Sequence, residues 1–188
     1  NRIEKGASFP KYHDTFFWLS DSMIANECFN CSDPNVGLSL NEDRTYVKCY
    51  MGEPDYYQHT FDENEISDGE LYREILLGKL SVNEGMFYEN VIAQMLVAAG
   101  HKLYFYTRYN EKSIATTWKL ILSVEPKQLK YKIFPIEVKS NDKYTIRSLI
   151  KFKESFHQRI GECYVIHPKN LYVKEGVVYL PAYMTFCL

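Results

Sequence analysis

The chain has 188 residues, of which 46% are hydrophobic and 24% are charged, a balance typical of folded globular proteins. Its apolar runs are far shorter than the roughly 20 residues that a membrane helix needs, which disfavours a membrane-spanning protein. The sequence shows no signal peptide, with its basic start, apolar stretch and small-residue cleavage site. We therefore expect a soluble, cytoplasmic protein.

The charge is unevenly distributed, although the net charge is only −2. Residues 1–68 hold 5 basic and 13 acidic side chains, whereas residues 126–159 hold 9 basic and 3 acidic ones. A basic stretch can attract phosphate groups. It can equally be the solvated face of a helix, so the charge alone does not predict nucleic-acid binding.

The first 60 residues are rich in aromatic side chains and contain turn signals at residues 33–35, 41–43 and 51–54. Between the last two turns, residues 45–50 (TYVKCY) predict one strand of a small hairpin. Residues 61–70 are acidic and carry Ser67-Asp68-Gly69, which is typical of a connector. The N-terminal third therefore differs in character from the remainder of the chain.

The later segments alternate between helical and strand patterns. Helices are predicted over residues 70–80, from a cap at Asn83 to a stop at Gly100, and over residues 145–160. Strands are predicted at residues 102–108, 116–124, 132–139, 162–166, 171–173 and 177–180. This succession predicts an α/β core with a mixed sheet.

The five cysteines argue against a disulfide framework, because their number is odd and the sequence shows no export signal. Cys28 and Cys31 have the spacing of half a zinc site, but no second pair completes it. A redox role is the other alternative for such a pair. We interpret the cysteines as reduced and structural.

One constellation points to chemistry: Glu89 in the helix after Asn83, and Glu137 with Lys139 at the end of the third strand. Side chains alternate along a strand, so Glu137 and Lys139 point to the same side of the sheet. Carboxylates can hold Mg²⁺, and a lysine can orient a water or offset charge on a phosphate. A plain ion pair is the competing interpretation of the same residues.

The order of the elements, the helix glutamate and the strand-borne E-x-K together resemble the PD-(D/E)XK nuclease superfamily. The chain is more closely similar to a domain of unknown function that follows an AAA-type ATPase module in many bacterial and archaeal proteins. The similarity covers most of the chain and rests on Phe17-Trp18-Leu19, Asp33-Pro34-Asn35-Val36-Gly37-Leu38, Lys48-Cys49-Tyr50-Met51-Gly52, Asn83-Glu84-Gly85-Met86, Glu89-Asn90, Ala93-Gln94, Gly100-His101-Lys102-Leu103 and Pro135-Ile136-Glu137-Val138-Lys139-Ser140.

The resemblance implies a restriction-endonuclease-like αβββαβ core in residues 69–188. It implies that residues 1–68 are a winged-helix-like linker segment, the remnant of a unit that comes after the ATPase. It also implies that Glu89 and Glu137 are metal ligands, with Mg²⁺ as the cofactor, and that Lys139 is catalytic. The chain has no phosphate-binding G-x-x-x-x-G-K-[ST] loop, so we expect no ATP site in it.

The chain departs from the family on the middle strand, where relatives carry the central metal-binding aspartate. Thr117 stands at the corresponding position, and a threonine is a poor Mg²⁺ ligand. The chain also departs after Met51-Gly52, where relatives have an aspartate and a glycine and this sequence reads Glu53-Pro54-Asp55-Tyr56. The nearby carboxylates Glu111, Glu125 and Asp142 do not fall on the predicted strand.

Three functions are compatible with this resemblance. The favoured one is a degenerate nuclease-fold module that binds DNA or the ATPase partner and no longer cuts. An alternative is an active Mg²⁺-dependent DNA nuclease using Glu89, Glu137 and Lys139. The third is a protein-interaction module without nucleic-acid binding, which suits the acidic N-terminal third.

Overall fold

The computed structural model describes residues 9–35, 37–52, 84–107, 120–124 and 132–188. In this part of the chain the helices are α1 (Phe9–Asp21), α4 (Glu84–Ala98) and α5 (Arg147–Phe156), with 3-10 helices η1 (Leu38–Asn41) and η3 (Ala182–Cys187). The strands are β1 (Ala25–Cys31), β2 (Glu42–Met51), β3 (Tyr104–Tyr106), β4 (Leu120–Val124), β5 (Ile133–Val138), β6 (Cys163–His167), β7 (Tyr172–Lys174) and β8 (Val177–Pro181).

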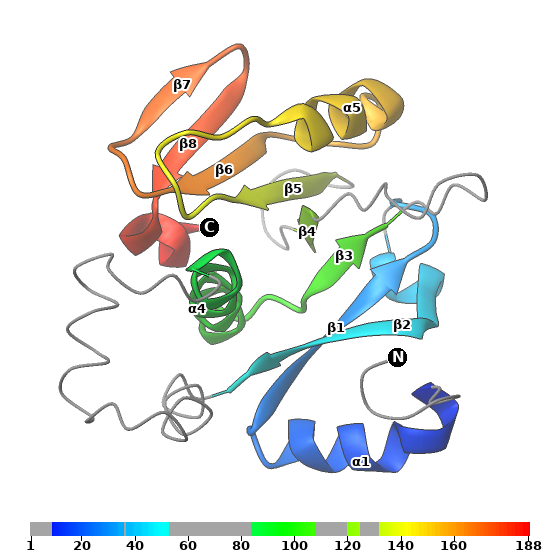
Figure 1. Ribbon diagram of the computed structural model, residues 1–188. Helices are drawn as coiled ribbons and strands as arrows, with labels where there is room; N and C mark the ends of the chain where they lie inside the picture. The colour runs from blue at the N-terminus through cyan, green and yellow to red at the C-terminus, as the bar shows by residue number, and fades with distance from the viewer. Residues whose placement is uncertain (1–8, 36, 53–83, 108–119, 125–131) are drawn as a thin grey trace, which may run out of the picture.

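All eight described strands form one mixed sheet in the order β2-β1-β3-β4-β5-β6-β8-β7 (Figure 1). The predicted α/β class with a mixed sheet is therefore confirmed. The pairs β3–β4 and β4–β5 are antiparallel, whereas β5–β6 and β6–β8 are parallel. The chain between β5 and β6 contains α5, which is the helical crossover that parallel neighbours require.

The N-terminal elements join the same sheet as the later ones. β1 pairs with β2 in antiparallel fashion and with β3 in parallel fashion. The predicted strand at residues 45–50 is confirmed as part of β2, while the sequence did not predict α1 or β1. The predicted boundary at residue 68 and the predicted helix at residues 70–80 lie outside the described residues.

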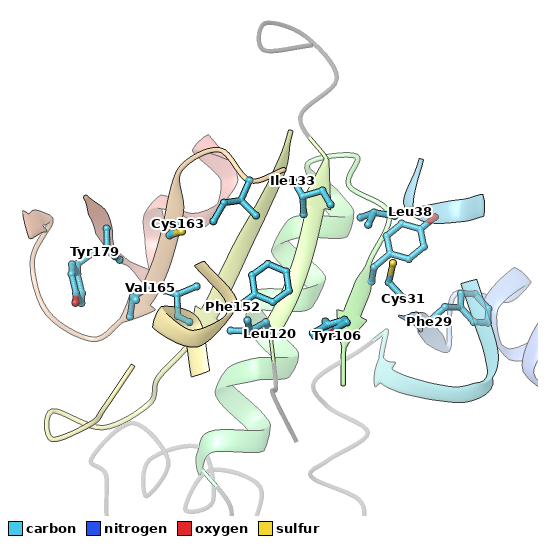
Figure 2. Packing of buried hydrophobic residues seen from close by; sticks show 14 residues of the cluster. Phe29, Cys31, Leu38, Tyr106, Leu120, Ile133, Phe152, Cys163, Val165 and Tyr179 are labelled. Atoms are coloured by element: carbon cyan, nitrogen blue, oxygen red, sulfur yellow. The ribbon is translucent and has the colours of Figure 1, made fainter. Parts of the chain in front are cut away.

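The helices cover opposite faces of the sheet, with α4 on one side and α5 on the other (Figure 1). On the α5 side, Leu149 and Phe152 pack against side chains that include Tyr106, Leu120 and Val165 (Figure 2). A second cluster lies on the α4 side, where residues of the helix pack against β1 to β6. Its buried helical members are Ile92, Ala93 and Leu96. The sheet thus separates two hydrophobic cores.

At two positions the backbone favours glycine over residues with a side chain. Gly100 has a φ of +93°, and the N–H of the next residue, His101, bonds to the Leu96 carbonyl oxygen. This closes the end of α4 as the sequence predicts. At the end of β2, a Cβ on Gly52 would collide with the carbonyl oxygen of Met23. Gly52 therefore allows the chain ahead of β1 to approach the end of β2.

Candidate functional site

Glu89, the helix glutamate that the sequence singles out, is held by two side chains of β2. Lys48 Nζ lies 3.1 Å from Glu89 Oε1, and the Tyr50 hydroxyl donates a 2.6 Å hydrogen bond to the same oxygen. Lys48 and Tyr50 are two residues apart on a strand, so both side chains point to the same face of the sheet. The Glu89 side chain is 22% exposed, so this ion pair is partly open to water.

Glu137 and Lys139 form an ion pair at the end of β5. Lys139 Nζ lies 2.8 Å from Glu137 Oε1, and only 6% of the Glu137 side chain is exposed. Within the described residues, no hydrogen bond of normal geometry reaches the buried Glu137 Oε2. Burial raises the pKa of Glu137, while Lys139 and the nearby backbone N–H of Leu149 oppose this rise. The same-side placement that the alternation predicts is observed.

The two carboxylates lie on opposite sides of the sheet. Ile136 and Val138, the neighbours of Glu137 in β5, pack in the cluster on the α4 side. Side chains alternate along a strand, so Glu137 points toward α5. Tyr50, which binds Glu89, packs in the α4-side cluster. The structure therefore gives each glutamate its own lysine and does not bring Glu89 and Glu137 together.

The described residues do not fit a Mg²⁺ site around Glu137. The register of β4 and β5 pairs Ile121 with Ile136, which sets Leu120 beside Glu137. Leu120 is fully buried and has no ligand atom in its side chain. In the part of the chain that the structure describes, no group of three or more His, Cys, Asp or Glu could hold a metal ion. Thr117, the threonine predicted at the metal-ligand position, lies outside the described residues.

A buried histidine and three tyrosines lie beside the Glu137–Lys139 pair, and sequence reasoning missed them. The Tyr144 hydroxyl lies 2.9 Å from His167 Nδ1, and the His167 ring meets the rings of Tyr172 and Tyr179 edge-on. His167 is on β6, which pairs with β5. The Lys139 N–H donates a hydrogen bond to the carbonyl oxygen of Ile166, the residue before His167. Burial lowers the pKa of His167, which favours a neutral imidazole.

No sequence signal could have revealed this group, because it depends on the parallel pairing of β5 with β6. The sequence does show a histidine directly after a run of strand residues, but it carries no ligand spacing. The stacked rings of Tyr172 and Tyr179 lie on the paired strands β7 and β8. The group fills the α5 side of the sheet with aromatic side chains.

Two further residues of α4 that belong to the family resemblance serve the fold. Asn90 Oδ1 accepts a 2.7 Å hydrogen bond from the Met51 N–H, and Asn90 Nδ2 donates to the Met51 carbonyl oxygen at 3.2 Å. Gln94 Nε2 donates to the carbonyl oxygens of Met51 and Gly52 at 2.9 and 2.7 Å. These bonds attach the end of β2 to α4, so the motif residues next to Glu89 position the strand that binds it.

Cys28 and Cys31 do not act as a pair. Cys28 packs in the α4-side cluster, whereas Cys31 packs in the α5-side cluster. Burial raises the pKa of Cys28 to about 12 and that of Cys31 to about 11, so both remain thiols at neutral pH. Their placement on opposite faces of β1 excludes a shared disulfide or metal ion in this fold and agrees with structural cysteines.

Three comparisons found no match: no family model, no curated protein and no solved structure matches the chain. The similarity to the PD-(D/E)XK superfamily therefore stays a prediction from the sequence. Among the described residues, no helix has the length and apolar character needed to cross a membrane.

Proposed function

We propose that this chain is a nuclease-fold module of the PD-(D/E)XK type that has lost catalysis and binds DNA, as part of a larger protein with an AAA-type ATPase module. The succession α4-β3-β4-β5-α5-β6 supports the fold assignment, because it is the αβββαβ order. The antiparallel pairs β3–β4 and β4–β5, followed by the parallel pair β5–β6, are compatible with it. The E-x-K motif lies at the end of the third strand of this core.

The main support for a loss of catalysis is the environment of Glu137. Its side chain is only 6% exposed, bound by Lys139 at 2.8 Å and placed beside Leu120. A hard cation needs several oxygen ligands and access from water. Binding at Glu137 would require the ion to displace Lys139 and to enter a face that α5 covers. The second expected ligand, Glu89, is held on the other face of the sheet.

The charge of the C-terminal part supports DNA as the ligand. Residues 132–159 hold 7 basic and 3 acidic side chains, whereas residues 1–68 are strongly acidic. A positive surface attracts the phosphate backbone without reading its sequence. The module would therefore anchor its larger protein on DNA, and the ATPase would supply the energy-dependent step.

Calorimetric titration of Mn²⁺ into the wild-type protein, Glu137→Ala and Thr117→Asp tests the loss of catalysis. We expect no wild-type binding and no Mn²⁺-dependent DNA cleavage. Binding gained in Thr117→Asp would support the alignment with the family's metal-binding aspartate. Wild-type binding that disappears in Glu137→Ala, together with cleavage, would establish an active nuclease and overturn this part of the proposal.

Fluorescence anisotropy with a labelled DNA duplex and a labelled single strand tests the second part. We expect binding that weakens steeply with salt, because phosphate contacts release condensed counterions. A protein that folds normally but binds neither DNA at low salt would contradict the proposal and favour a protein-interaction module.

A further inference from the structure

The exposed side of α5 carries cations without a neutralising partner among the described residues. Arg147 and Lys151 are exposed and lie one turn apart, on the side of the helix opposite the buried Leu149 and Phe152. Lys143, shortly before the helix, is also exposed. No ion pair joins any of these three cations to another residue that the structure describes. We call Lys143, Arg147 and Lys151 the α5 basic stripe.

Three other basic side chains of the same region are engaged. Lys139 binds Glu137 at 2.8 Å, Arg159 binds Asp33 at 2.5 Å, and Lys153 Nζ donates to the carbonyl oxygens of Glu175 and Gly176. These contacts neutralise or fix the charges around the helix. Among the described residues on the solvent side of α5, the cations that remain for a ligand are therefore those of the α5 basic stripe.

The start of α5 adds to this positive charge. Ile146 precedes the helix and provides no side-chain cap, and the first turn contains no acidic residue. The first N–H groups of a helix carry partial positive charge and attract anions. Glu137 lies beneath this end near the Leu149 N–H, but its own charge is compensated by Lys139. The first turn of α5 thus brings no acidic side chain of its own to this end of the helix.

A hollow lies at the other end of the same helix. Its volume is about 390 Å³, and it is lined by Asp33, Ser155, Phe156, His157, Gln158 and Arg159. This size lies within the range of small-molecule pockets. Gln158 and Ser155 continue the solvent side of α5 beyond Lys151, so the α5 basic stripe leads along the helix toward this hollow.

We propose that a DNA strand lies along α5, with its phosphates on the α5 basic stripe and the next nucleotide in the hollow beside His157 and Gln158. This assignment rests on the proposed DNA binding and specifies the surface that binds the DNA. Arg147 and Lys151 are separated by about 6 Å along the helix axis, so they can contact successive phosphates of one strand. Glu154 lies on the same side of the helix and opposes the ligand.

The test compares two double variants that remove the same charge. Arg147→Gln with Lys151→Gln removes the two helical cations of the stripe, and Lys11→Gln with Lys174→Gln removes two exposed cations elsewhere. Affinity for labelled DNA is measured by anisotropy over a series of salt concentrations. With a single-stranded probe, we expect the stripe variant to bind about tenfold more weakly or worse at low salt, with a salt slope reduced by about 1.4, since each lost phosphate contact lowers it by roughly 0.7.

Two more variants sharpen the result. Glu154→Gln should tighten binding several-fold, and Arg147→Lys with Lys151→Arg should bind like the wild type because the charges remain. Thermal unfolding checks that all variants fold. Wild-type binding with equal losses in the two double variants would overturn the assignment to α5 while leaving DNA binding intact. A folded wild type that binds no DNA would overturn both proposals.

Discussion

Each side of the sheet carries one glutamate–lysine pair, and the two pairs differ in access and in what they join. On the α4 side, Lys48 and Glu89 connect an edge strand to a helix, and their side chains are 26% and 22% exposed. On the α5 side, Glu137 lies near the end of β5, Lys139 follows directly after this strand, and Glu137 is buried. Both glutamates were candidates for the same metal site, yet the sheet lies between them.

This contrast shows that an E-x-K motif fixes the side on which two charges meet but not their access to solvent. Because side chains alternate along a strand, the two charged residues of an E-x-K motif point to the same side of any sheet. Whether the pair can take a metal ion depends on what covers it, which here is α5. An exposed ion pair contributes little to stability, whereas breaking a buried one leaves an uncompensated charge. The two pairs should therefore respond very differently to mutation.

Lys139→Met should produce the largest effect. It leaves the Glu137 carboxylate buried without its cation, and we expect the free energy of unfolding at pH 7 to fall by about 3–5 kcal/mol. Urea unfolding followed by circular dichroism measures this change. Lys143→Met, which removes an exposed lysine four residues later, should stay within about 0.5 kcal/mol of the wild type. Equal effects of the two variants would contradict a buried, compensated Glu137.

Asn90→Ala should have the next largest effect and tests the α4 side. Asn90 is 1% exposed and makes two hydrogen bonds to the backbone of Met51. Its loss leaves the Met51 N–H without this acceptor, so we expect a cost of about 1–3 kcal/mol by urea unfolding. Val97→Ala, at an exposed position of the same helix, is the control and should be nearly neutral. A neutral Asn90→Ala would mean that α4 does not hold the end of β2.

The pH dependence of the free energy of unfolding should report the raised pKa of the buried Glu137. Burial raises the folded-state pKa of Glu137 above its ordinary value of 4.5. Its protonated form therefore favours the fold, and this contribution is complete below the unfolded pKa and is lost as pH rises through the folded pKa. Relative to Glu137→Gln, the wild type should lose stability as pH rises above 4.5.

The measurement is the free energy of unfolding of both proteins over a pH series from about pH 4 to about pH 8, which begins near the ordinary carboxyl pKa and extends above it. Glu154→Gln, at an exposed position of α5, serves as the control. A wild type that gains stability relative to Glu137→Gln over this range would show that the pKa of Glu137 is lowered and that its charged form is the one stabilised.

Lys48→Met should give the smallest effect. Glu89 keeps the hydrogen bond from Tyr50 and its contact with water, so we expect a loss of at most about 1 kcal/mol in urea unfolding. A loss as large as that of Lys139→Met would remove the contrast between the two sides of the sheet.

Local patterns predicted much of the later part of the fold. The helical spacing of Leu149, Phe152 and Phe156 predicted the buried face of α5, and Gly100 marked the end of α4. Alternation along residues 132–139 placed Glu137 and Lys139 on one side, and the ion pair weighed against a metal site is the contact observed. These features depend on residues close together in the sequence.

The rest depends on contacts between distant segments. β1 contains Asn26, Glu27 and Asn30, which do not suggest a strand, but it is stabilised by pairing with β2 and β3. The side of the sheet that Glu137 faces is set by which helix packs there, and no local pattern encodes that choice. The Tyr144–His167 contact likewise requires the parallel register of β5 and β6.

The central claim is that Glu137 is held in a buried ion pair with Lys139 and is not a metal ligand. A double-mutant cycle on these two residues, beside one on Glu89 and Lys48, tests this claim most directly. The variants are Glu137→Gln with Lys139→Met and Glu89→Gln with Lys48→Met, measured by urea unfolding at neutral pH. We predict a coupling energy of about 2 kcal/mol or more for the buried pair and about 1 kcal/mol or less for the partly exposed one. A coupling energy near zero for Glu137 and Lys139, with Mn²⁺ stabilising the wild type but not Glu137→Gln, would contradict the buried ion pair.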